Sequence, residues 1–579
     1  LDIQNGTYDN ENGASIIVTG STSGDNIRFN DTSFVGDSTT NILINNGTTS
    51  CDWNNSFGYR GNLRIASPYR SLNGTNNKCG NLTVATGGEL DGDNDILTVH
   101  GDFTTSGGLI GTSALETVAS SSESASTSGN YTVLDNQASC TIEFWLKLTD
   151  ISNNTARILN VNSGGSGEAY YVRTDGSSLQ FHLGCATTDA TFTSADNSLL
   201  LLTNLGTKFH HYALVKDNDT VSLYIDGKKA AEKTTSGNTQ SANSALFLGQ
   251  FRGGDSNFAD MVMDELRFYT DARTESEIRS NMFTDSPSGD NLVGHYKFDE
   301  GTGTTVADSS SNSNALTLTS SDAFADSGTF DAGTSTVVMA KSGTQTIAYN
   351  HLDNDFHNLT INAGSTTQLL SIDGTGSLQD INEDLIVNGI LKSHPDSTGS
   401  RIRLRDPSAT FTVDSSVKDT ALADLARIQI DGNGTFNIPE LTTKRIFSTS
   451  SGTIVSASGP LTVTEEIQVD SGTTFNANGN TITCAFLDVN AGATVDLRNS
   501  TYLGTTGGDF NRFDFFHANS TNSLLTGNTT ITGTTSPLTQ GFFPSGANLE
   551  IVGNMSNIHV KDDGDITVVG SVTNCTIEE

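Results

Sequence analysis

The sequence is poor in basic residues, proline, methionine and tryptophan, with 30 Lys+Arg, 8 Pro, 5 Met and 2 Trp in 579 positions. Because 66 Asp+Glu bring the net charge to −36, the chain repels phosphate backbones, and we expect no nucleic-acid partner. No run approaches the roughly 18 apolar residues of a membrane-spanning helix, so we expect no membrane insertion. The chain begins at Leu1 with neither a Met nor a signal-like segment, which indicates processing or a longer parent protein.

Cysteine is also scarce, and the 6 cysteines form no C-x-x-C motif. So few thiols in a chain of this length do not make a disulfide scaffold. Two pairings, Cys51–Cys79 and Cys140–Cys185, stay open for an oxidising medium. We favour scattered, buried thiols, because a free cysteine packs as a small hydrophobic residue.

Small turn-forming residues are abundant instead, with 58 Gly, 53 Asn and 144 Ser and Thr together. Gly and Asn tolerate positive φ, and side-chain hydroxyls satisfy turn backbone, so this composition predicts short strands joined by many tight turns. The hydrophobic residues, 34% of the chain, lie in regular short runs that can bury a core. We therefore predict an all-β protein.

Similar strand-and-turn units recur in two regions, 1–112 and 321–579. IQVDSGTTF at 467–475 aligns with LDVNAGATV at 487–495, and IQIDGNGTF at 428–436 has the same form. A repeat of about 20 residues is typical of a parallel β-solenoid, whose coils bury inward-facing Leu, Ile and Val against one another. Because the period is irregular elsewhere, a stack of small β-sandwiches stays open as the alternative.

The middle segment, 113–320, has longer and more aromatic runs, such as TIEFWLKL at 141–148. Runs of this length separated by turns are typical of an antiparallel sandwich. A short helix is expected from Thr274 to Met282, with Glu277 completing a capping box. Outside this segment, the tract at 415–430 is the one place where a short helix is predicted to start.

Three motifs of the middle segment carry a family resemblance: LYIDG at Leu223–Gly227, DELRFY at Asp264–Tyr269 and FDEGTGTTVADSS at Phe298–Ser310. Together they resemble the laminin-G/concanavalin A-like lectin superfamily, whose fold is an antiparallel jelly roll. The flanks resemble, more loosely, the β-helical regions of viral tail fibres and microbial surface proteins. Since GDFTTSGG and SGTFDAG look like broken coils on either side, the jelly roll is expected to be inserted between solenoid coils.

The resemblance implies glycan binding at an edge or face of the sandwich, commonly with Ca²⁺. Sugar recognition needs polar groups converging beside an aromatic platform, and Ca²⁺ takes oxygen ligands. The ligands predicted here are Asp308, Asn312 and Asn314, while a purely structural role for the module stays open. Trp145 and Tyr224 lie in apolar strand patterns and are expected in the core.

A second candidate Ca²⁺ site is DGDND, which places Asp91, Asp93 and Asp95 at alternate positions, the opening spacing of a calcium loop. The rest of the loop departs from the pattern, with Ile96 where Gly is expected and Asp102 where Glu is expected. A solvated turn is therefore the alternative.

The aromatic cluster DFNRFDFFHAN is a candidate saccharide groove, in which Phe513, Phe515 and Phe516 lie near Asp514. A core or subunit-contact role is the alternative. The sequence has no H-E-x-x-H, G-x-S-x-G or P-loop motif, so no catalytic residue is assigned.

These features predict a non-enzymatic structural and adhesive protein of a virion or cell surface, in which a solenoid spacer displays a lectin-like domain for glycan or protein contact. Homo-oligomerisation is expected, because solenoid ends and strand edges must be capped or paired. The settings considered are a viral tail fibre or capsid-decorating protein, or an S-layer, sheath or surface-filament subunit. The alternatives are a polysaccharide-degrading β-helix enzyme with an accessory carbohydrate-binding domain, and a secreted Ca²⁺-dependent lectin.

Overall fold

The structure is a computed structural model that describes residues 61–504 with short gaps, together with residues 40–45 and a set of short strands outside that span. The gaps are at 70–76, 94, 165–166, 253–256, 290, 350–354, 372–377, 398, 491–492 and 498–499. The chain divides into two compact units. The first comprises Leu1–Gly74, Cys79–Asp91 and Thr104–Phe330, and the second comprises Thr75–Lys78, Gly92–Phe103 and Asp331–Glu579. The predicted domain boundaries after residues 112 and 320 stay predictions.

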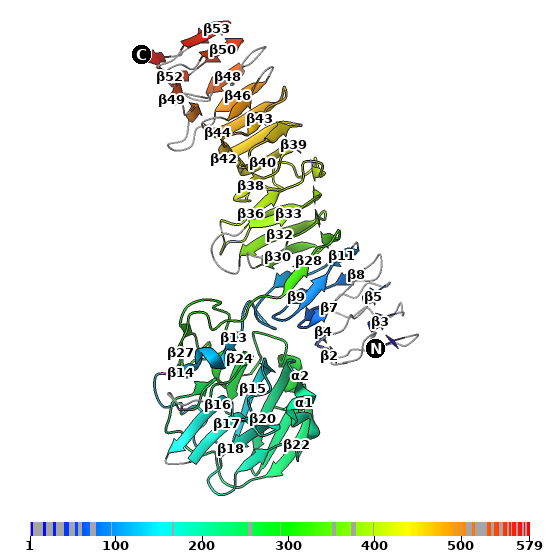
Figure 1. The fold of residues 1–579 in the computed structure, drawn as a ribbon, viewed down its shortest axis with the longest axis vertical. Helices are drawn as coiled ribbons and strands as arrows, with labels where there is room; N and C mark the ends of the chain where they lie inside the picture. The colour runs from blue at the N-terminus through cyan, green and yellow to red at the C-terminus, as the bar shows by residue number, and fades with distance from the viewer. Residues whose placement is uncertain are drawn as a thin grey trace. The chain divides into compact units, whose positions relative to one another are not determined.

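The second unit is built of coils whose strands pair in parallel (Figure 1). One sheet runs through β36 (Arg401–Leu404), β38 (Arg427–Ile430), β40 (Leu441–Ser448), β42 (Leu461–Val469) and β44 (Thr481–Val489). Another runs through β39 (Gly434–Ile438), β41 (Thr453–Ala457), β43 (Thr474–Asn476) and β45 (Thr494–Asp496). Parallel sheets that pass through successive coils confirm the β-solenoid and replace the alternative of stacked small sandwiches in this region.

The repeat seen in the sequence is the repeat of these coils. Ile428 pairs with Ile446, Ile446 with Ile467, and Ile467 with Leu487, and all four side chains are buried. The last pair aligns the two segments that match in sequence, 467–475 and 487–495. Because each inward side chain is covered by the coils on both sides, stacking stabilises the sheet more than any single coil does.

The helix predicted at 415–430 is wrong. Residues 415–420 form turns, in which the backbone N–H of Val417 donates to Asp414 O at 3.0 Å. The Asp414 carboxylate also accepts the backbone N–H of Ser416 at 2.8 Å and its hydroxyl at 2.6 Å. Such local bonds from Asp and Ser compete with a helix, and Arg427–Ile430 is strand β38 instead.

The lectin-like segment is inserted between neighbouring coils, as predicted. In the second unit, β11 (Ile96–Val99) pairs in parallel with β29 (Thr336–Met339), with Ile96 opposite Thr336. The two strands lie side by side in one sheet although the whole sandwich lies between them in sequence.

The sandwich of the first unit consists of two antiparallel sheets (Figure 1). The β15 sheet has the order β13 (Leu115–Thr117), β24 (Met261–Tyr269), β15 (Ser139–Leu148), β20 (His210–Asp217), β21 (Thr220–Ile225) and β22 (Lys228–Thr234), and β25 (Leu292–Tyr296) also pairs with β24. The β17 sheet has the order β19 (Ala190–Phe192), β18 (Ser178–Leu183), β17 (Gly167–Asp175), β16 (Arg157–Gly164), β23 (Phe247–Leu248), β14 (Ala125–Thr127), β27 (Leu316–Leu318) and β26 (Thr305–Val306).

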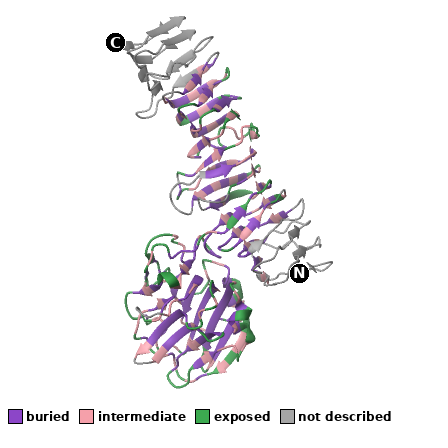
Figure 2. Ribbon diagram, viewed as in Figure 1, coloured by how far each residue is buried: buried purple, intermediate pink, exposed green. Residues whose placement is uncertain are grey.

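The core lies between the two sheets, and Figure 2 shows their strands as largely buried. Alternate residues of β15 face this core, with Ile142, Phe144 and Leu146 in the core cluster. Phe144 meets Phe181 of the β17 sheet, with ring centroids 6.4 Å apart. The intervening residues of β15 therefore lie on the outer face of the β15 sheet.

Helix α2 (Glu275–Asn281) lies over that outer face and has the predicted capping box. The Thr274 hydroxyl accepts the backbone N–H of Glu277 at 3.3 Å, and the Glu277 carboxylate accepts the backbone N–H of Thr274 at 2.8 Å. From the helix, Ile278 packs against the outward side chains Ala213, Val215 and Tyr224.

The cysteines that the structure describes are free and buried, as predicted; they are Cys79, Cys140, Cys185 and Cys484. Burial raises the pKa of the Cys79 and Cys140 thiols to about 12, which keeps them protonated. Cys51 and Cys575 lie outside the described residues. Within the described part of the chain, no helix is both long and apolar enough to cross a membrane.

Candidate functional site

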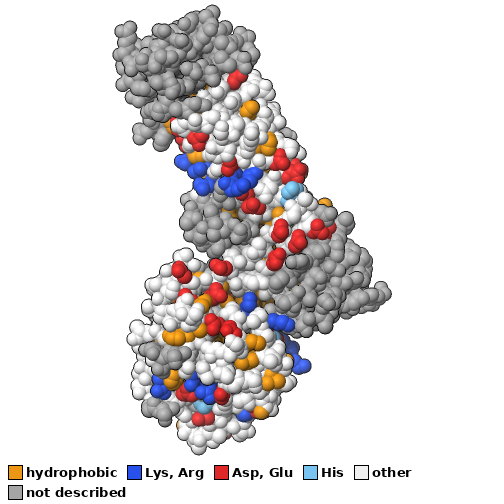
Figure 3. All heavy atoms as spheres, viewed as in Figure 1, with side chains coloured by type: hydrophobic (Ala, Val, Ile, Leu, Met, Phe, Trp, Pro, Cys, Tyr) orange, Lys and Arg blue, Asp and Glu red, His pale blue; other side chains and the backbone are white. Residues whose placement is uncertain are grey.

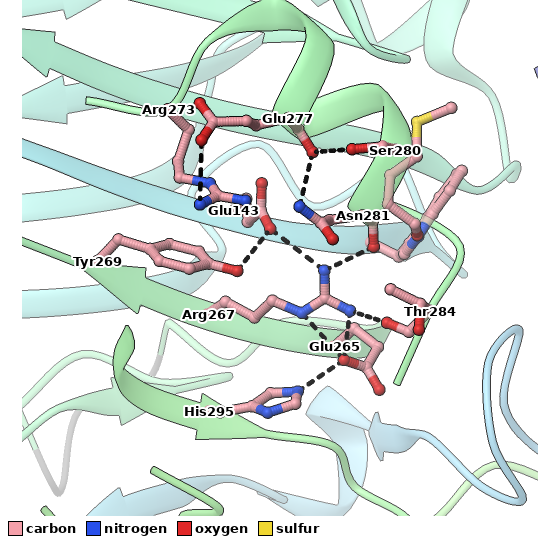
Figure 4. A network of polar contacts seen from close by, with 12 residues as sticks. Glu143, Glu265, Arg267, Tyr269, Arg273, Glu277, Ser280, Asn281, Thr284 and His295 are labelled. Atoms are coloured by element: carbon pink, nitrogen blue, oxygen red, sulfur yellow. Dashed lines mark hydrogen bonds and ion pairs between the residues drawn. The ribbon is translucent and has the colours of Figure 1, made fainter. Parts of the chain in front are cut away.

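The outer face of the β15 sheet holds a buried network of charged side chains around Arg267 (Figure 4). The Arg267 guanidinium contacts Glu265 Oε2 at 2.6 Å through Nη2 and Glu143 Oε1 at 3.2 Å through Nη1. Glu265 Oε2 also lies 2.7 Å from His295 Nε2, and Arg267 Nη1 donates to Asn281 O at 2.9 Å. All three ion-paired side chains are at most 1% exposed, so no ligand reaches them.

The DELRFY motif therefore has a structural role in this chain. Asp264 Oδ2 accepts the backbone N–H groups of Leu109 and Ile110 at 2.8 and 2.9 Å, which ties the segment entering the sandwich to β24. The Asp226 carboxylate of the LYIDG turn accepts the backbone N–H of His211 at 3.0 Å, and Asp226 itself has φ +53°. Both aspartates therefore hold the backbone in place, Asp226 at a turn and Asp264 at the edge of a strand.

Side chains also close this face. Trp145 is 0% exposed and packs against Phe283, with ring centroids 5.1 Å apart, and its indole N–H donates to Met282 O at 2.5 Å. Tyr224 is 7% exposed beneath α2. The prediction that Trp145 and Tyr224 are core residues is confirmed, and a ligand must be sought on the other sheet.

On the outer face of the β17 sheet, one row of side chains, which we call the Tyr171 row, crosses five neighbouring strands. Asn160 pairs with Phe247 on one side and Tyr171 on the other, Tyr171 pairs with His182, and His182 pairs with Thr191. Paired residues of an antiparallel sheet share a face. Their neighbours Val161, Val172 and Phe181 lie in the core cluster, so the row points away from it.

Planar side chains gather around Tyr171. The His182 ring stacks on it with centroids 4.7 Å apart and an interplanar angle of 10°. The guanidinium carbons of Arg157 and Arg173 lie 5.2 and 5.0 Å from the centre of the Tyr171 ring. Guanidinium groups over an aromatic face are held by cation–π attraction, so four planar groups form one rigid cluster.

Hydrogen bonds fix the polar edges of this cluster. Gln180 Oε1 accepts the Tyr171 hydroxyl at 2.9 Å and Arg173 Nε at 2.7 Å. Glu168 Oε1 pairs with Arg157 Nη1 at 2.8 Å. Arg173 keeps 28% of its side chain exposed and Glu168 keeps 19%, so donors and an acceptor face solvent together.

His182 lies between Tyr171 and Thr191 in the row and is half-buried. Burial lowers its pKa, although the carboxylates of Asp189 and Glu168 act in the opposite direction. Its Nδ1 lies 2.8 Å from the Thr191 hydroxyl. The ring is thus already hydrogen-bonded within the sheet, to the Thr191 hydroxyl and to the backbone of Glu168, and contributes its planar face to the cluster.

Asn160 is the one member of the row whose amide is unsatisfied. Its side chain is 0% exposed, and neither Nδ2 nor Oδ1 has a hydrogen-bond partner among the described residues. A buried amide without partners costs about 1–3 kcal/mol, so an ordered water beside Asn160 would stabilise the sheet.

The predicted ligands Asp308, Asn312 and Asn314 lie in one loop between β26 and β27, and all three take part in its structure. Asp308 accepts three backbone N–H groups, those of His295, Ser310 and Asn314, each at 2.9 Å. Asn312 Nδ2 donates to Val293 O at 2.8 Å. The loop is thus organised by its own side chains, and calcium binding there stays a prediction.

Asp91, Asp93 and Asp95 lie at a turn between β10 (Glu89–Asp91) and β11, where Asp93 has φ +48° and its carbonyl accepts the N–H of Thr334 at 2.6 Å. Among the described residues, no three His, Cys, Asp or Glu side chains form a group that could hold a metal ion.

The C-terminal aromatic cluster is described only as backbone. Phe513, Asp514 and Phe515 belong to β47 (Arg512–Phe515), which pairs in parallel with β44. Their side chains and the whole of Phe516 lie outside the described residues. The saccharide groove predicted there stays a prediction.

Residues 120–279 match the sequence model of the concanavalin A-like lectin/glucanases superfamily. This segment has a concanavalin A-like sandwich fold. The match includes β14 through β24, and with them the whole Tyr171 row. The search of curated proteins gave no match.

Solved structures are similar only over parts of the chain. A candidate carbohydrate-binding protein from Bacteroides ovatus ATCC 8483 is 18% identical with a TM-score of 0.29, over 37% of this chain and 61% of that one. The binding domain of Paraclostridial mosquitocidal protein 1 is 16% identical with a TM-score of 0.21, over 26% and 37%. Trypanosoma rangeli sialidase is 19% identical with a TM-score of 0.20, over 25% and 22%. The chain thus spans less than two thirds of each.

Sequence reasoning missed the Tyr171 row. A signal was present, because YVRTDGSSLQFH at 171–182 is an alternating hairpin with a turn at Asp175–Ser178. That register pairs Tyr171 with His182 and Arg173 with Gln180.

Proposed function

We propose that this chain binds glycans through the outer face of the β17 sheet without cleaving them. The observation that carries the proposal is the cluster on this face, set in a sandwich of the lectin/glucanase superfamily, in which Arg173 and the half-buried His182 meet solvent against the buried Tyr171 and Arg157. Lectin sites combine rigid planar groups with converging donors and acceptors, and this face has both. The opposite outer face is filled by α2 and by the Arg267 network.

Binding is favoured over hydrolysis by the state of Glu168, a carboxylate beside the row. Glu168 is held by Arg157 in an ion pair of 2.8 Å, so its oxygen serves the structure of the cluster. A glycosidase needs two carboxylates free to act on either side of a bond.

We propose a setting outside the cell or on a virion, in which many copies are displayed together. A single weak sugar site gains avidity when copies are linked, because the second binding event takes place at high effective concentration. The charge of −36 supports this setting, since an exposed repetitive surface must stay soluble. Self-association and bound Ca²⁺ belong to the same proposal.

The test is binding of the full chain to a panel of immobilised neutral and acidic oligosaccharides. We expect Arg173→Ala and His182→Ala each to weaken binding to the recognised glycan by about tenfold, the equivalent of one good contact. Arg279→Ala is the matched control, because Arg279 is 52% exposed and lies on α2, away from the face.

Two results would overturn the proposal. One is a glycan affinity that falls equally in the control and in the two face variants. The other is release of reducing ends from a bound polysaccharide that stops on Glu168→Gln, because that outcome makes the face an active site.

A further inference from the structure

Three arginines of the second unit lie in register on neighbouring solenoid strands. Arg401 of β36 pairs with Arg427 of β38, and the next pair, Ile428 with Ile446, places Arg445 of β40 beside Arg427. Parallel strands lie about 4.8 Å apart, so the column is a ladder of cations with that step. The alternate residues of these strands are buried, which puts the arginines on the outer face.

The ladder is unusual in so acidic a chain. Like charges opposite each other on a sheet destabilise it. Burial lowers the pKa of Arg427, and the neighbouring charges of Arg401 and Arg445 lower it further. Figure 3 shows Lys and Arg side chains gathered in a band on this part of the chain.

Acidic side chains compensate only one end of the ladder. Arg445 Nε contacts Glu465 Oε2 at 2.7 Å, and Glu466 follows Arg445 in the column. Within the described residues, Arg401 and Arg427 have no ion pair, and Arg401 Nε is buried without a hydrogen-bond partner. Two adjacent guanidinium groups therefore have no direct ion pair, and the Glu466 carboxylate, which acts to raise the pKa of Arg427, is outweighed by burial and by the neighbouring arginines.

The neighbouring column of side chains, which begins at Arg403, contains amides and an aromatic ring. Arg403 is occupied by Asp380, with contacts of 2.7 and 2.6 Å from Nε and Nη2. After it in register come Gln429, Phe447 and Gln468. The Arg427 guanidinium lies 4.1 Å from the centre of the Phe447 ring. Amides and an aromatic ring thus lie beside the two arginines that have no ion pair.

We propose that this face binds an acidic polysaccharide lying along the coils, with its carboxylate or sulfate groups on Arg401 and Arg427. Guanidinium groups bind such anions through paired N–H donors, and anions bound between them would relieve the repulsion in the ladder. Gln429 and Gln468 offer amides to sugar hydroxyls. A nucleic-acid backbone has far fewer hydroxyl groups than a polysaccharide. Duplex DNA also needs more cationic contacts than three arginines supply.

The site lies on other strands than the Tyr171 row, so each is tested by its own variants. The full chain is applied at low salt to immobilised polygalacturonate, dextran sulfate and neutral dextran. We expect binding to at least one acidic polymer and none to dextran. Arg401→Gln/Arg427→Gln should weaken that binding by about tenfold or more, whereas the control Arg279→Gln, which removes one exposed charge of the other unit, should leave it unchanged. The two acidic polymers distinguish carboxylate from sulfate recognition.

Thermal unfolding separates a ligand site from a structural one. Because the double variant removes like-charge repulsion, its Tm should stay the same or rise. A fall of several degrees would overturn the proposal, as would equal losses in the control, failure to bind either acidic polymer, or equal retention on duplex DNA. Self-association that disappears in the double variant would instead assign the ladder to contacts between copies.

Discussion

Replacing Arg267 with methionine is expected to destabilise the sandwich by about 3–5 kcal/mol, the usual cost of removing one partner from a buried ion pair. Arg267, Glu143 and Glu265 are each at most 1% exposed. Methionine fills much of the volume but leaves two carboxylates without a cation, and Asn281 O loses its donor. Urea unfolding followed by tryptophan fluorescence measures the effect, because Trp145 is buried on the same face and the chain has only 2 Trp.

The control is a variant that also neutralises the carboxylates, Arg267→Met/Glu143→Gln/Glu265→Gln. It should recover part of the loss, since the uncompensated charges cause most of it. Arg173→Ala supplies the comparison at an exposed ion pair, where a change within about 1 kcal/mol is expected. An Arg267→Met effect as small as that of Arg173→Ala would show that the network does not stabilise the sandwich.

The solenoid could be predicted from the sequence because each coil repeats the same environment. Residues 467 and 487 occupy equivalent places in successive coils, so the same pattern of buried and turn residues is needed in both. The helix at Thr274 was equally predictable, because its cap is local. The prediction of a helix at 415–430 fails for a local reason as well. The apolar spacing suits a helix, but the hydrogen bonds between Asp414 and Ser416 form a turn at the point where the helix would begin.

The candidate glycan face could not be predicted in full, because β-bulges decide which residues share it. The pairing of β16 with β17 shifts between Arg157 and Leu159, so both Arg157 and Asn160 reach the outer face although they are three positions apart. A strict alternation would place them on opposite faces. The arginine ladder was hidden in a similar way, since coils of unequal length separate Arg401, Arg427 and Arg445.

Lowering the pH is expected to destabilise the sandwich through His211. Burial, and then the charge of Arg267, lower the pKa of His211 from 6.5 to about 3. Between these values the unfolded chain holds a proton on this histidine that the folded chain does not. The stabilisation is therefore complete above pH 6.5 and is lost as the pH falls toward 3, by about 5 kcal/mol in total at 1.36 kcal/mol per pKa unit.

Comparing variants isolates this effect, because Asp299 acts in the opposite direction. Burial first raises its pKa from 3.8 to about 6, so the folded chain gains a proton before the unfolded chain and is stabilised as the pH falls through this range. Relative to wild type, His211→Gln should gain about 3 kcal/mol in unfolding free energy between pH 7 and pH 4, whereas Asp299→Asn should lose stability over the same interval. A difference between wild type and His211→Gln that does not change with pH would show that His211 is not kept neutral by burial. Because His211 lies against Trp145, with ring centroids 5.2 Å apart, the same fluorescence signal reports its environment.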